Sequence, residues 1–345
     1  MNNIDALNSK LVSSIDDKYP IDLPYGKMGI CIYFYYLSRW EDKEEYKQIA
    51  EKLLDEITGK LSSKKNVGVA YTSAGIAIGI SHLVKEKFIE GDINEILEDM
   101  DSHIFKTLAF LKDEEFSYPK PMYLLFLYYL QLRYTAQSSS EGKYIFQELI
   151  IKTVELFQEK LPVDFFGGHF SFDAYNYSMP FYLYVVSKIY GLNIYNQRLT
   201  NILQEKIGLT LSTIPVLQAN RLYMMWGLLC IKPYLPIYKK EIEAHVRLLK
   251  EKINIEYIMN VEFKNQDIYF KDGLSLVYFL LFFIQMKYPE YKIDCDPQLF
   301  INKINTSEAW KALMNRDYYY HKHMALFDGF PGAYLVSLHI KKHFQ

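Results

Sequence analysis

Two acidic side chains and one histidine lie beside glycines, in positions where they could perform acid–base chemistry. Asp272 and Asp328 each precede a glycine at the expected start of a helix, and His169 follows Gly167 and Gly168. A carboxyl group and an imidazole that face one substrate atom can act as general acid and base. More commonly, an Asp at a helix start caps backbone N–H groups, and a lone His is a hydrogen-bonded structural residue. We therefore expect capping by the two acids and keep all three residues as catalytic candidates.

The segment from Asp317 to His323 has the most unusual local composition, with three tyrosines and two histidines. In an extended segment, His321 and His323 would point the same way and could bind a metal together. Asp328 is the nearest candidate for a third ligand, but the spacing does not supply one. Tyrosines offer stiff contact area with a hydrogen-bonding tip, so we expect an aromatic loop that lines the opening of a cavity.

These residues accompany a short motif, in its fullest form Gly-x-x-Gly, that recurs along the whole chain. Its clearest copies end at Gly29, Gly75 and Gly332. Successive copies lie between 46 and 58 residues apart, which is the signature of a repeat architecture. The last motif position falls at Gly29, Gly75, Met122, Pro180, Gly227, Leu276 and Gly332.

Each motif precedes an apolar run that is predicted to be an inner helix, and charged amphipathic stretches such as 41–54 and 239–249 are predicted to be outer helices. Neither end of the chain resembles the polar capping repeat that an open stack needs. We therefore expect an all-α (α/α) toroid or barrel of about seven helical hairpins, with an inner and an outer ring, as one domain over residues 1–345. The predicted inner helices cover 30–37, 76–84, 122–132, 181–190, 228–234, 277–286 and 334–340.

The composition excludes several classes of protein. Half of the residues are hydrophobic and the net charge is −2, so we expect no nucleic-acid partner and no anionic membrane partner. The apolar runs are shorter than the roughly twenty residues that cross a bilayer, and no signal peptide is recognisable at the N-terminus. Three widely spread cysteines, Cys31, Cys230 and Cys295, fit a reducing compartment, so we expect a cytoplasmic protein. No P-loop, dinucleotide fingerprint or nucleophile elbow is present.

The seven-fold Gly-x-x-Gly pattern resembles the lanthionine synthetase C-like family, cyclases that close thioether rings in ribosomally made peptides. The resemblance implies a zinc ion at the mouth of the toroid, held by a Cys in the fifth motif and a Cys-His pair in the sixth. In this sequence Leu222 stands at the first position, beside a matching Tyr223 and Gly227, and Lys271 and Asp272 stand at the pair. Leu and the Lys ammonium cannot donate electrons to zinc, and one Asp cannot hold it alone. We expect no zinc and no lanthionine formation.

Other positions also depart from the family pattern. The third motif, residues 116–122, lacks the catalytic Asp that the resemblance implies, and the fourth, residues 176–180, lacks the His. Cys230 is the only alternative thiol near the fifth motif, and we expect it to pack in the core as a small hydrophobe.

If the ring closes, the N-termini of the inner helices converge at its mouth and would suit an anion such as a peptide carboxylate. We expect this mouth to be lined by Tyr25, Tyr71, Tyr118, Arg221, Leu222, Tyr223, Lys271, Asp272, His321, His323 and Asp328.

The leading hypothesis is a lanthionine synthetase C-like pseudoenzyme without zinc-dependent cyclase activity. It would bind a peptide, or a protein of a peptide-maturation pathway, in its central cavity. One alternative is a zinc-independent peptide-modifying enzyme that uses Asp272, Asp328 or His169. Another is a sugar-active α/α-barrel enzyme, which needs two carboxylates about 5 to 10 Å apart.

Overall fold

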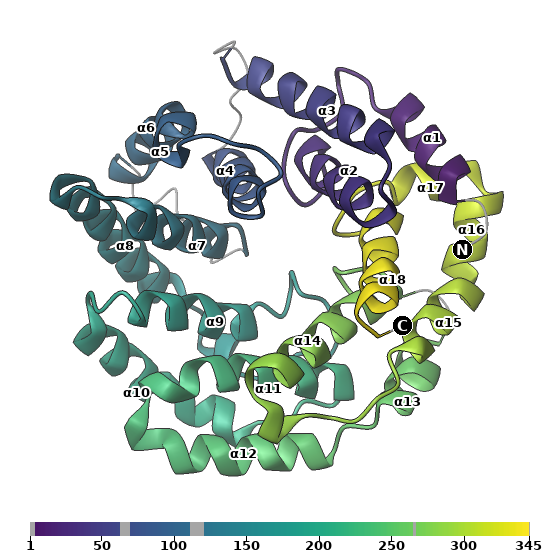
Figure 1. The fold of residues 1–345 in the computed structure, drawn as a ribbon. Helices are drawn as coiled ribbons and strands as arrows, with labels where there is room; N and C mark the ends of the chain where they lie inside the picture. Colours follow the sequence, from purple (N-terminus) through teal and green to yellow (C-terminus); the bar gives the residue numbers. More distant parts are fainter. Residues whose placement is uncertain (1–3, 63–69, 111–120, 265–266, 345) are drawn as a thin grey trace. The chain divides into compact units, whose positions relative to one another are not determined.

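The computed structural model describes residues 4–62, 70–110, 121–264 and 267–344, which form helices and loops without a β-strand (Figure 1). The predicted inner runs all fall within or overlap helices, and the predicted outer stretches match α3 (Glu44–Ser62) and α12 (Lys239–Glu251). In the described part of the chain, no helix is long and apolar enough to cross a membrane.

The chain divides into two compact units. The first contains Met1–Glu90, Ile255–Phe279 and Asp294–Gln345, and the second contains Gly91–Asn254 and Leu280–Ile293, so that α14 (Leu274–Lys287) contributes to both. The single domain expected over residues 1–345 stays a prediction.

The first unit is built around α2, which is buried along most of its length, including Met28, Ile30 and Tyr33. The helices α3, α4 and α18 pack against it, and Figure 1 shows α3 alongside α2. The helices of this unit are α1 (Ile4–Ser14), α2 (Lys27–Glu41), α3, α4 (Ala70–Lys85), α13 (Ile255–Tyr257), the first part of α14, α15 (Gln298–Thr306), α16 (Glu308–Asn315), α17 (Asp317–Lys322) and α18 (Phe330–Phe344).

The second unit is built around α9 and α11, which pack against each other, with α12 against α11 and α8 against α7. Most of α11 is buried, from Ala219 through Ile231. The helices of this unit are α5 (Ile93–Ile96), α6 (Glu98–Ala109), α7 (Pro121–Ala136), α8 (Ser140–Lys160), α9 (Met179–Tyr190), α10 (Asn196–Ser212), α11 (Gln218–Ile231), α12 and the second part of α14.

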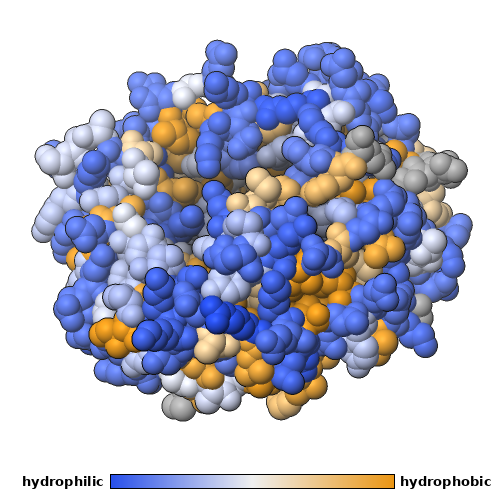
Figure 2. Space-filling view, turned by 60° about the horizontal axis from the view of Figure 1, so that its bottom comes forward, coloured by the Kyte–Doolittle hydropathy of each residue, from blue (hydrophilic) through white to orange (hydrophobic). Residues whose placement is uncertain are grey.

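Hydrophilic side chains cover most of the face seen in Figure 2, and apolar side chains gather in separate patches. This pattern is usual for a protein surface, of which apolar atoms still contribute a large share.

Three inner helices of the first unit begin in the same way. In each, the first helical N–H bonds to the carbonyl of the residue seven positions earlier: Lys27 to Pro20, Leu274 to Asp267 and Phe330 to His323, at 2.8, 2.9 and 3.0 Å. The chain thus folds back as a tight entry loop before α2, α14 and α18. This bond satisfies one of the N–H groups that a helix start leaves unpaired.

The second motif glycine lets the neighbouring entry loop pack closely. A Cβ on Gly29 would overlap the Leu23 carbonyl of its own loop and lie 2.7 Å from the Leu326 Cβ of the loop before α18. A Cβ on Gly332 would lie 2.7 Å from the Phe270 ring, which belongs to the loop before α14. One apolar side chain of each loop therefore occupies the space that the glycine of the next repeat leaves open.

The fifth motif departs from the sequence prediction. The helix expected at 228–234 begins at Gln218 and ends at Ile231, so Gly227 lies well inside α11 and does not mark a helix start. There, a Cβ on Gly227 would lie 2.7 Å from the Pro180 Cα of α9. This glycine brings two helices together and does not shape an entry turn.

We expect Gly29→Ala to lower the free energy of unfolding by about 2 kcal/mol or more, because the added methyl group meets a backbone carbonyl that cannot move aside. Urea unfolding followed by circular dichroism measures the change.

Gly59→Ala is the matched control, since nothing lies within 4 Å of its Cβ and it sits inside α3. There the exchange should stabilise the protein by up to about 1 kcal/mol. Equal effects at the two glycines would contradict the packing argument.

Candidate functional site

The entry loops of the first unit are joined to one another by backbone hydrogen bonds. The Lys271 N–H donates to the Phe327 carbonyl at 2.9 Å, and the Phe327 N–H donates to the Pro24 carbonyl at 3.1 Å. These three residues hold the same position, two before the first motif glycine. The adjoining residues Tyr25, Asp272 and Asp328 therefore occupy equivalent places in three connected loops.

Half-buried carboxyl groups gather in these loops. Burial, together with the negative charge of Asp272, raises the pKa of Asp267 to about 6. Burial also raises the pKa of Asp328, against the lowering effect of the positive charges of His323 and Lys271. Asp22, whose carboxylate accepts the Tyr25 N–H at 2.7 Å, has a pKa raised by burial. A carboxyl group with a pKa near 6 can both give and take a proton near neutral pH.

A stack of aromatic rings lies beside the carboxyl groups. The His323 ring contacts Tyr269 and Tyr319, with centroid distances of 4.5 and 4.3 Å, and the two phenol groups are hydrogen-bonded at 3.1 Å. The His323 Nδ1 is 2.7 Å from the carbonyl oxygen of Asp328. This contact fixes the imidazole against the loop before α18.

The aromatic loop expected over this segment is instead helical, and the extended geometry that a His-x-His metal pair would need is not formed. Residues Asp317–Lys322 form the short helix α17, because the Arg316 carbonyl accepts the Tyr320 N–H and begins a helical turn. His321 is exposed and lies 3.4 Å from the Asp317 carboxylate, whereas His323 is half-buried and its ring contacts Tyr269 and Tyr319. The two imidazoles therefore have different surroundings.

Main-chain carbonyls accept N–H groups at the helix starts beside Asp272 and Asp328. The N–H groups from Leu274 to Val277 all donate to backbone carbonyls, and the Phe330 N–H donates to the His323 carbonyl. The N–H groups named here are thus satisfied by main-chain oxygens, and capping by the two carboxylates stays a prediction.

In the second unit, His169 belongs to a hydrogen-bonded loop. Its Nδ1 accepts the Ser171 N–H at 3.2 Å, and its ring is stacked on Tyr177 with centroids 6.1 Å apart. The Asn220 side chain of α11 donates to the carbonyls of His169 and Ser171, at 2.8 and 3.0 Å. These contacts are the structural role that we expected to be the commoner one for this histidine.

Three polar atoms of the second unit are enclosed without a hydrogen-bond partner among the described residues: the Tyr177 hydroxyl, the Asn220 Oδ1 and the Trp226 Nε1. Their residues are at most 4% exposed. Asn220, Tyr223 and Trp226 are spaced three apart on α11 and so share one face, and Tyr223 contacts both Tyr177 and Trp226 through its ring. Such atoms carry a desolvation cost and are candidates for binding a polar ligand.

The remaining predicted residues have varied surroundings. Arg221 donates to the carbonyls of Pro215, Val216 and Lys252 at 2.7 to 2.9 Å, which ties α11 to adjoining loops. The Tyr25 ring packs edge-to-face against Phe327. Tyr118 lies outside the described residues, as does the side chain of Tyr71.

The donor set does not fit zinc. Leu222 is fully buried and offers no lone pair, and Lys271 offers an ammonium group. Within residues 4–62, 70–110, 121–264 and 267–344, no three His, Cys, Asp or Glu side chains are grouped as a metal would need. Cys230 is buried, and burial raises its pKa to about 12, so it is a neutral thiol near pH 7. The absence of zinc itself stays a prediction.

Sequence reasoning missed three residues of the first-unit site: Asp22, Asp267 and Tyr269. One signal was available, since Pro20, Asp267 and His323 each lie six residues before the first motif glycine. That shared spacing marks the start of each entry loop.

Comparisons with known proteins show the fold. No protein-family model matches the sequence, and no curated protein matches it. Among solved structures, the chain is similar to nisin cyclase with a TM-score of 0.63 and 13% identity, over 99% of this chain and 95% of that one. The all-α fold and the resemblance predicted from the Gly-x-x-Gly pattern are confirmed.

We expect Asp267 to make stability depend on pH. Its pKa is about 6 in the folded protein and about 4 in an unfolded chain, so the folded state binds more protons between these values. Its contribution to the free energy of unfolding is fully present below pH 4 and is lost as the pH rises through 6. Urea unfolding measures the free energy of unfolding of the wild type and of Asp267→Asn from pH 4 to 7. The wild-type value minus the variant value should fall as the pH rises.

Carboxyl NMR provides an independent check. In Asp272→Asn the pKa of Asp267 should fall, because a neighbouring negative charge is removed. An Asp267 that titrates near pH 4 in the wild type would contradict the described electrostatics.

We expect Tyr177→Phe to raise the free energy of unfolding by about 1 kcal/mol, because it removes a buried hydroxyl that lacks a partner. Tyr190→Phe is the control: the Tyr190 hydroxyl bonds to the Thr200 hydroxyl at 2.9 Å, so its loss should destabilise by about 1 kcal/mol. Both changes are read from urea unfolding, and destabilisation by Tyr177→Phe would mean that this hydroxyl is satisfied in solution.

Proposed function

We propose that this chain is a lanthionine synthetase C-like protein that binds a peptide and does not close thioether rings by zinc chemistry. One observation carries the proposal: the positions that would hold the metal are a buried Leu222 and the pair Lys271 and Asp272. A cyclase of this kind needs a metal-bound thiolate as nucleophile. Without donors at these positions, no such thiolate forms.

Peptide binding is supported by the fold and by features of each unit. The chain has the fold of nisin cyclase, a protein named for its action on the peptide nisin. In the second unit, the enclosed polar atoms of Tyr177, Asn220 and Trp226 lack a hydrogen-bond partner among the described residues, and they lie next to the Tyr223 ring. A peptide backbone has both the donors and the acceptors that these atoms lack. In the first unit, carboxyl groups beside Lys271 offer charges of both signs.

A second candidate function is zinc-independent proton transfer on a peptide. It is favoured by the raised pKa of Asp267 and by the electrostatic effect of Asp272 on this carboxyl group. A base with a pKa near 6 in a half-buried loop is the kind of group that general acid–base catalysis uses. Asp328, with its raised pKa, would be the partner acid.

The three cysteines are free, which fits a protein of a reducing compartment. Cys31 and Cys230 are buried and none of the three forms a disulfide. We therefore propose that the protein works in the cytoplasm, where precursor peptides are made.

The test combines metal content, binding and chemistry on one preparation of the full chain. We expect well below one zinc per chain by inductively coupled plasma mass spectrometry. A fluorescein-labelled peptide that contains dehydroalanine and cysteine should bind, measured by anisotropy. Its free thiol should persist during incubation at neutral pH.

Tyr177→Phe is the informative variant, since it should bind the peptide more weakly while being at least as stable as the wild type. Tyr190→Phe should leave binding unchanged. One tightly held zinc per chain with loss of the peptide thiol would overturn the proposal, as would failure to bind any peptide. Consumption of the intact peptide by the wild type but not by Asp267→Asn would favour the second candidate.

A further inference from the structure

The second unit contains a cavity that shares no residue with the candidate site. It lies among α6, α7 and α8, next to the short helix α5, and has a volume of about 490 Å³. Ligand pockets typically enclose about 300 to 1,000 Å³. One part of the wall is apolar, with Phe105, Ile145, Phe146 and Leu149, and another is polar, with Asn94, Asp101, Arg133 and Gln137.

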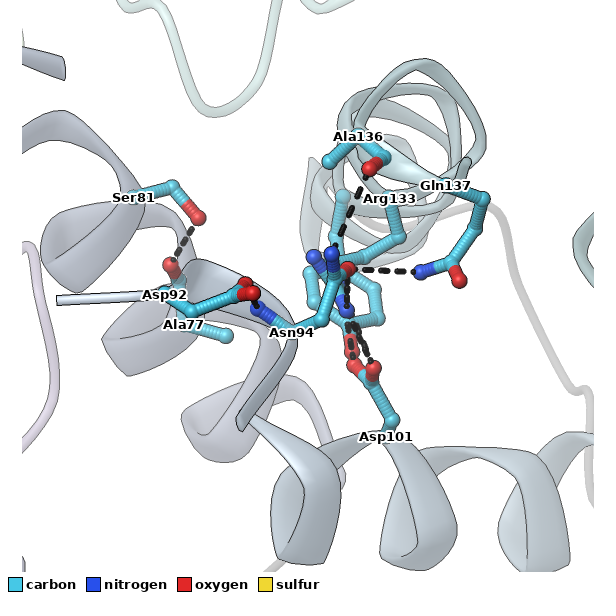
Figure 3. Close-up of polar contacts among 9 residues, drawn as sticks. Ala77, Ser81, Asp92, Asn94, Asp101, Arg133, Ala136 and Gln137 are labelled. Carbon is cyan, nitrogen blue, oxygen red and sulfur yellow. Dashed lines mark hydrogen bonds and ion pairs between the residues drawn. The ribbon is translucent and has the colours of Figure 1, made fainter. Parts of the chain in front are cut away.

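Arg133 is held rigidly at the polar part of the wall. It is 1% exposed, and its Nε and Nη2 donate to the Asp101 carboxylate, with the shortest contact at 2.7 Å. Asp101 also accepts the hydroxyl of the buried Tyr129. The Arg133 Nη2 donates to the Asn94 Oδ1 at 2.9 Å, and Gln137 donates to the same oxygen at 3.0 Å. Figure 3 shows the guanidinium between Asp101 and Asn94, with Gln137 beside them.

The other end of this guanidinium has no acceptor. The Arg133 Nη1 is enclosed and makes no hydrogen bond within the part of the chain that the structure describes. A buried donor without a partner is unusual and costs free energy in the empty protein. A ligand that supplies an oxygen acceptor would remove that cost.

The charge balance indicates which acceptor fits. The wall carries two positive side chains, Lys106 and Arg133, and two negative ones, Glu98 and Asp101. Because Asp101 already neutralises the guanidinium in a bidentate pair, Arg133 offers no net positive charge to an anion, and the four charged side chains of the wall balance one another. The apolar wall favours a largely hydrophobic molecule.

We propose that this cavity binds a neutral, largely apolar ligand whose carbonyl oxygen accepts a hydrogen bond from the Arg133 Nη1. The aromatic or aliphatic part of the ligand lies against Phe105, Ile145, Phe146 and Leu149. Amides and related carbonyl compounds are the chemical class that this wall recognises.

The test compares three small probes of similar shape: phenylacetamide, phenylacetate and ethylbenzene. Each is titrated into the full chain carrying labelled isoleucine and leucine methyl groups, and the methyl signals of Ile145 and Leu149 are followed by NMR. We expect these signals to shift with phenylacetamide. Its affinity should exceed that of ethylbenzene about tenfold, the value of one hydrogen bond to a charged group, and phenylacetate should bind no tighter than the amide.

Two matched variants on α6 locate the site. Ser102 is exposed and lines the cavity, so Ser102→Trp should fill it and weaken phenylacetamide binding at least tenfold. His103→Trp, one residue along and not part of the wall, should leave binding unchanged, and thermal unfolding shows that both variants fold. Equal binding of ethylbenzene, tighter binding of phenylacetate, absence of methyl shifts, or full binding by Ser102→Trp would each overturn the proposal.

Discussion

The close approach of an entry loop to the first turn of the helix that follows it is the contact on which the first unit depends. A backbone carbonyl seven residues upstream accepts the first helical N–H of α2, α14 and α18. This geometry leaves no room for a Cβ on the motif glycines, since at Gly26 one would lie 2.5 Å from the Asp22 nitrogen. The same loops then bond to one another through Lys271, Phe327 and Pro24. Loop shape, helix start and contact between repeats are therefore set together.

The electrostatics of the first-unit site follow from this scaffold. Loops held this tightly bring acidic side chains from distant parts of the sequence into one half-buried region, where water cannot fully screen them. The raised pKa values of Asp22, Asp267 and Asp328 are the result. The hydroxyl of Tyr19 belongs to the same region, since burial and the charges of Asp328 and Asp22 raise its pKa to about 12. A change in loop packing would alter all of these groups at once.

The sequence predicted the fold well because the glycine pattern reflects backbone packing, which tolerates few substitutions. It predicted Asp272 and Asp328 as members of the site, because both adjoin those glycines. It did not predict Asp22 or Asp267, since burial and charge proximity arise only after distant loops meet. The predicted start of α11 was wrong for a related reason. Gly227 packs against Pro180 of another helix, and the presence of a glycine does not distinguish that role from an entry turn.

The series of bonds between entry loops has a direction. The loop before α14 donates to the loop before α18, which donates to the loop before α2. The acceptor in that last loop is Pro24, and a proline has no N–H with which to continue the series. Copies of the motif that look equivalent in the sequence therefore hold different positions in this series of hydrogen bonds. The proline makes the N-terminal copy its last acceptor.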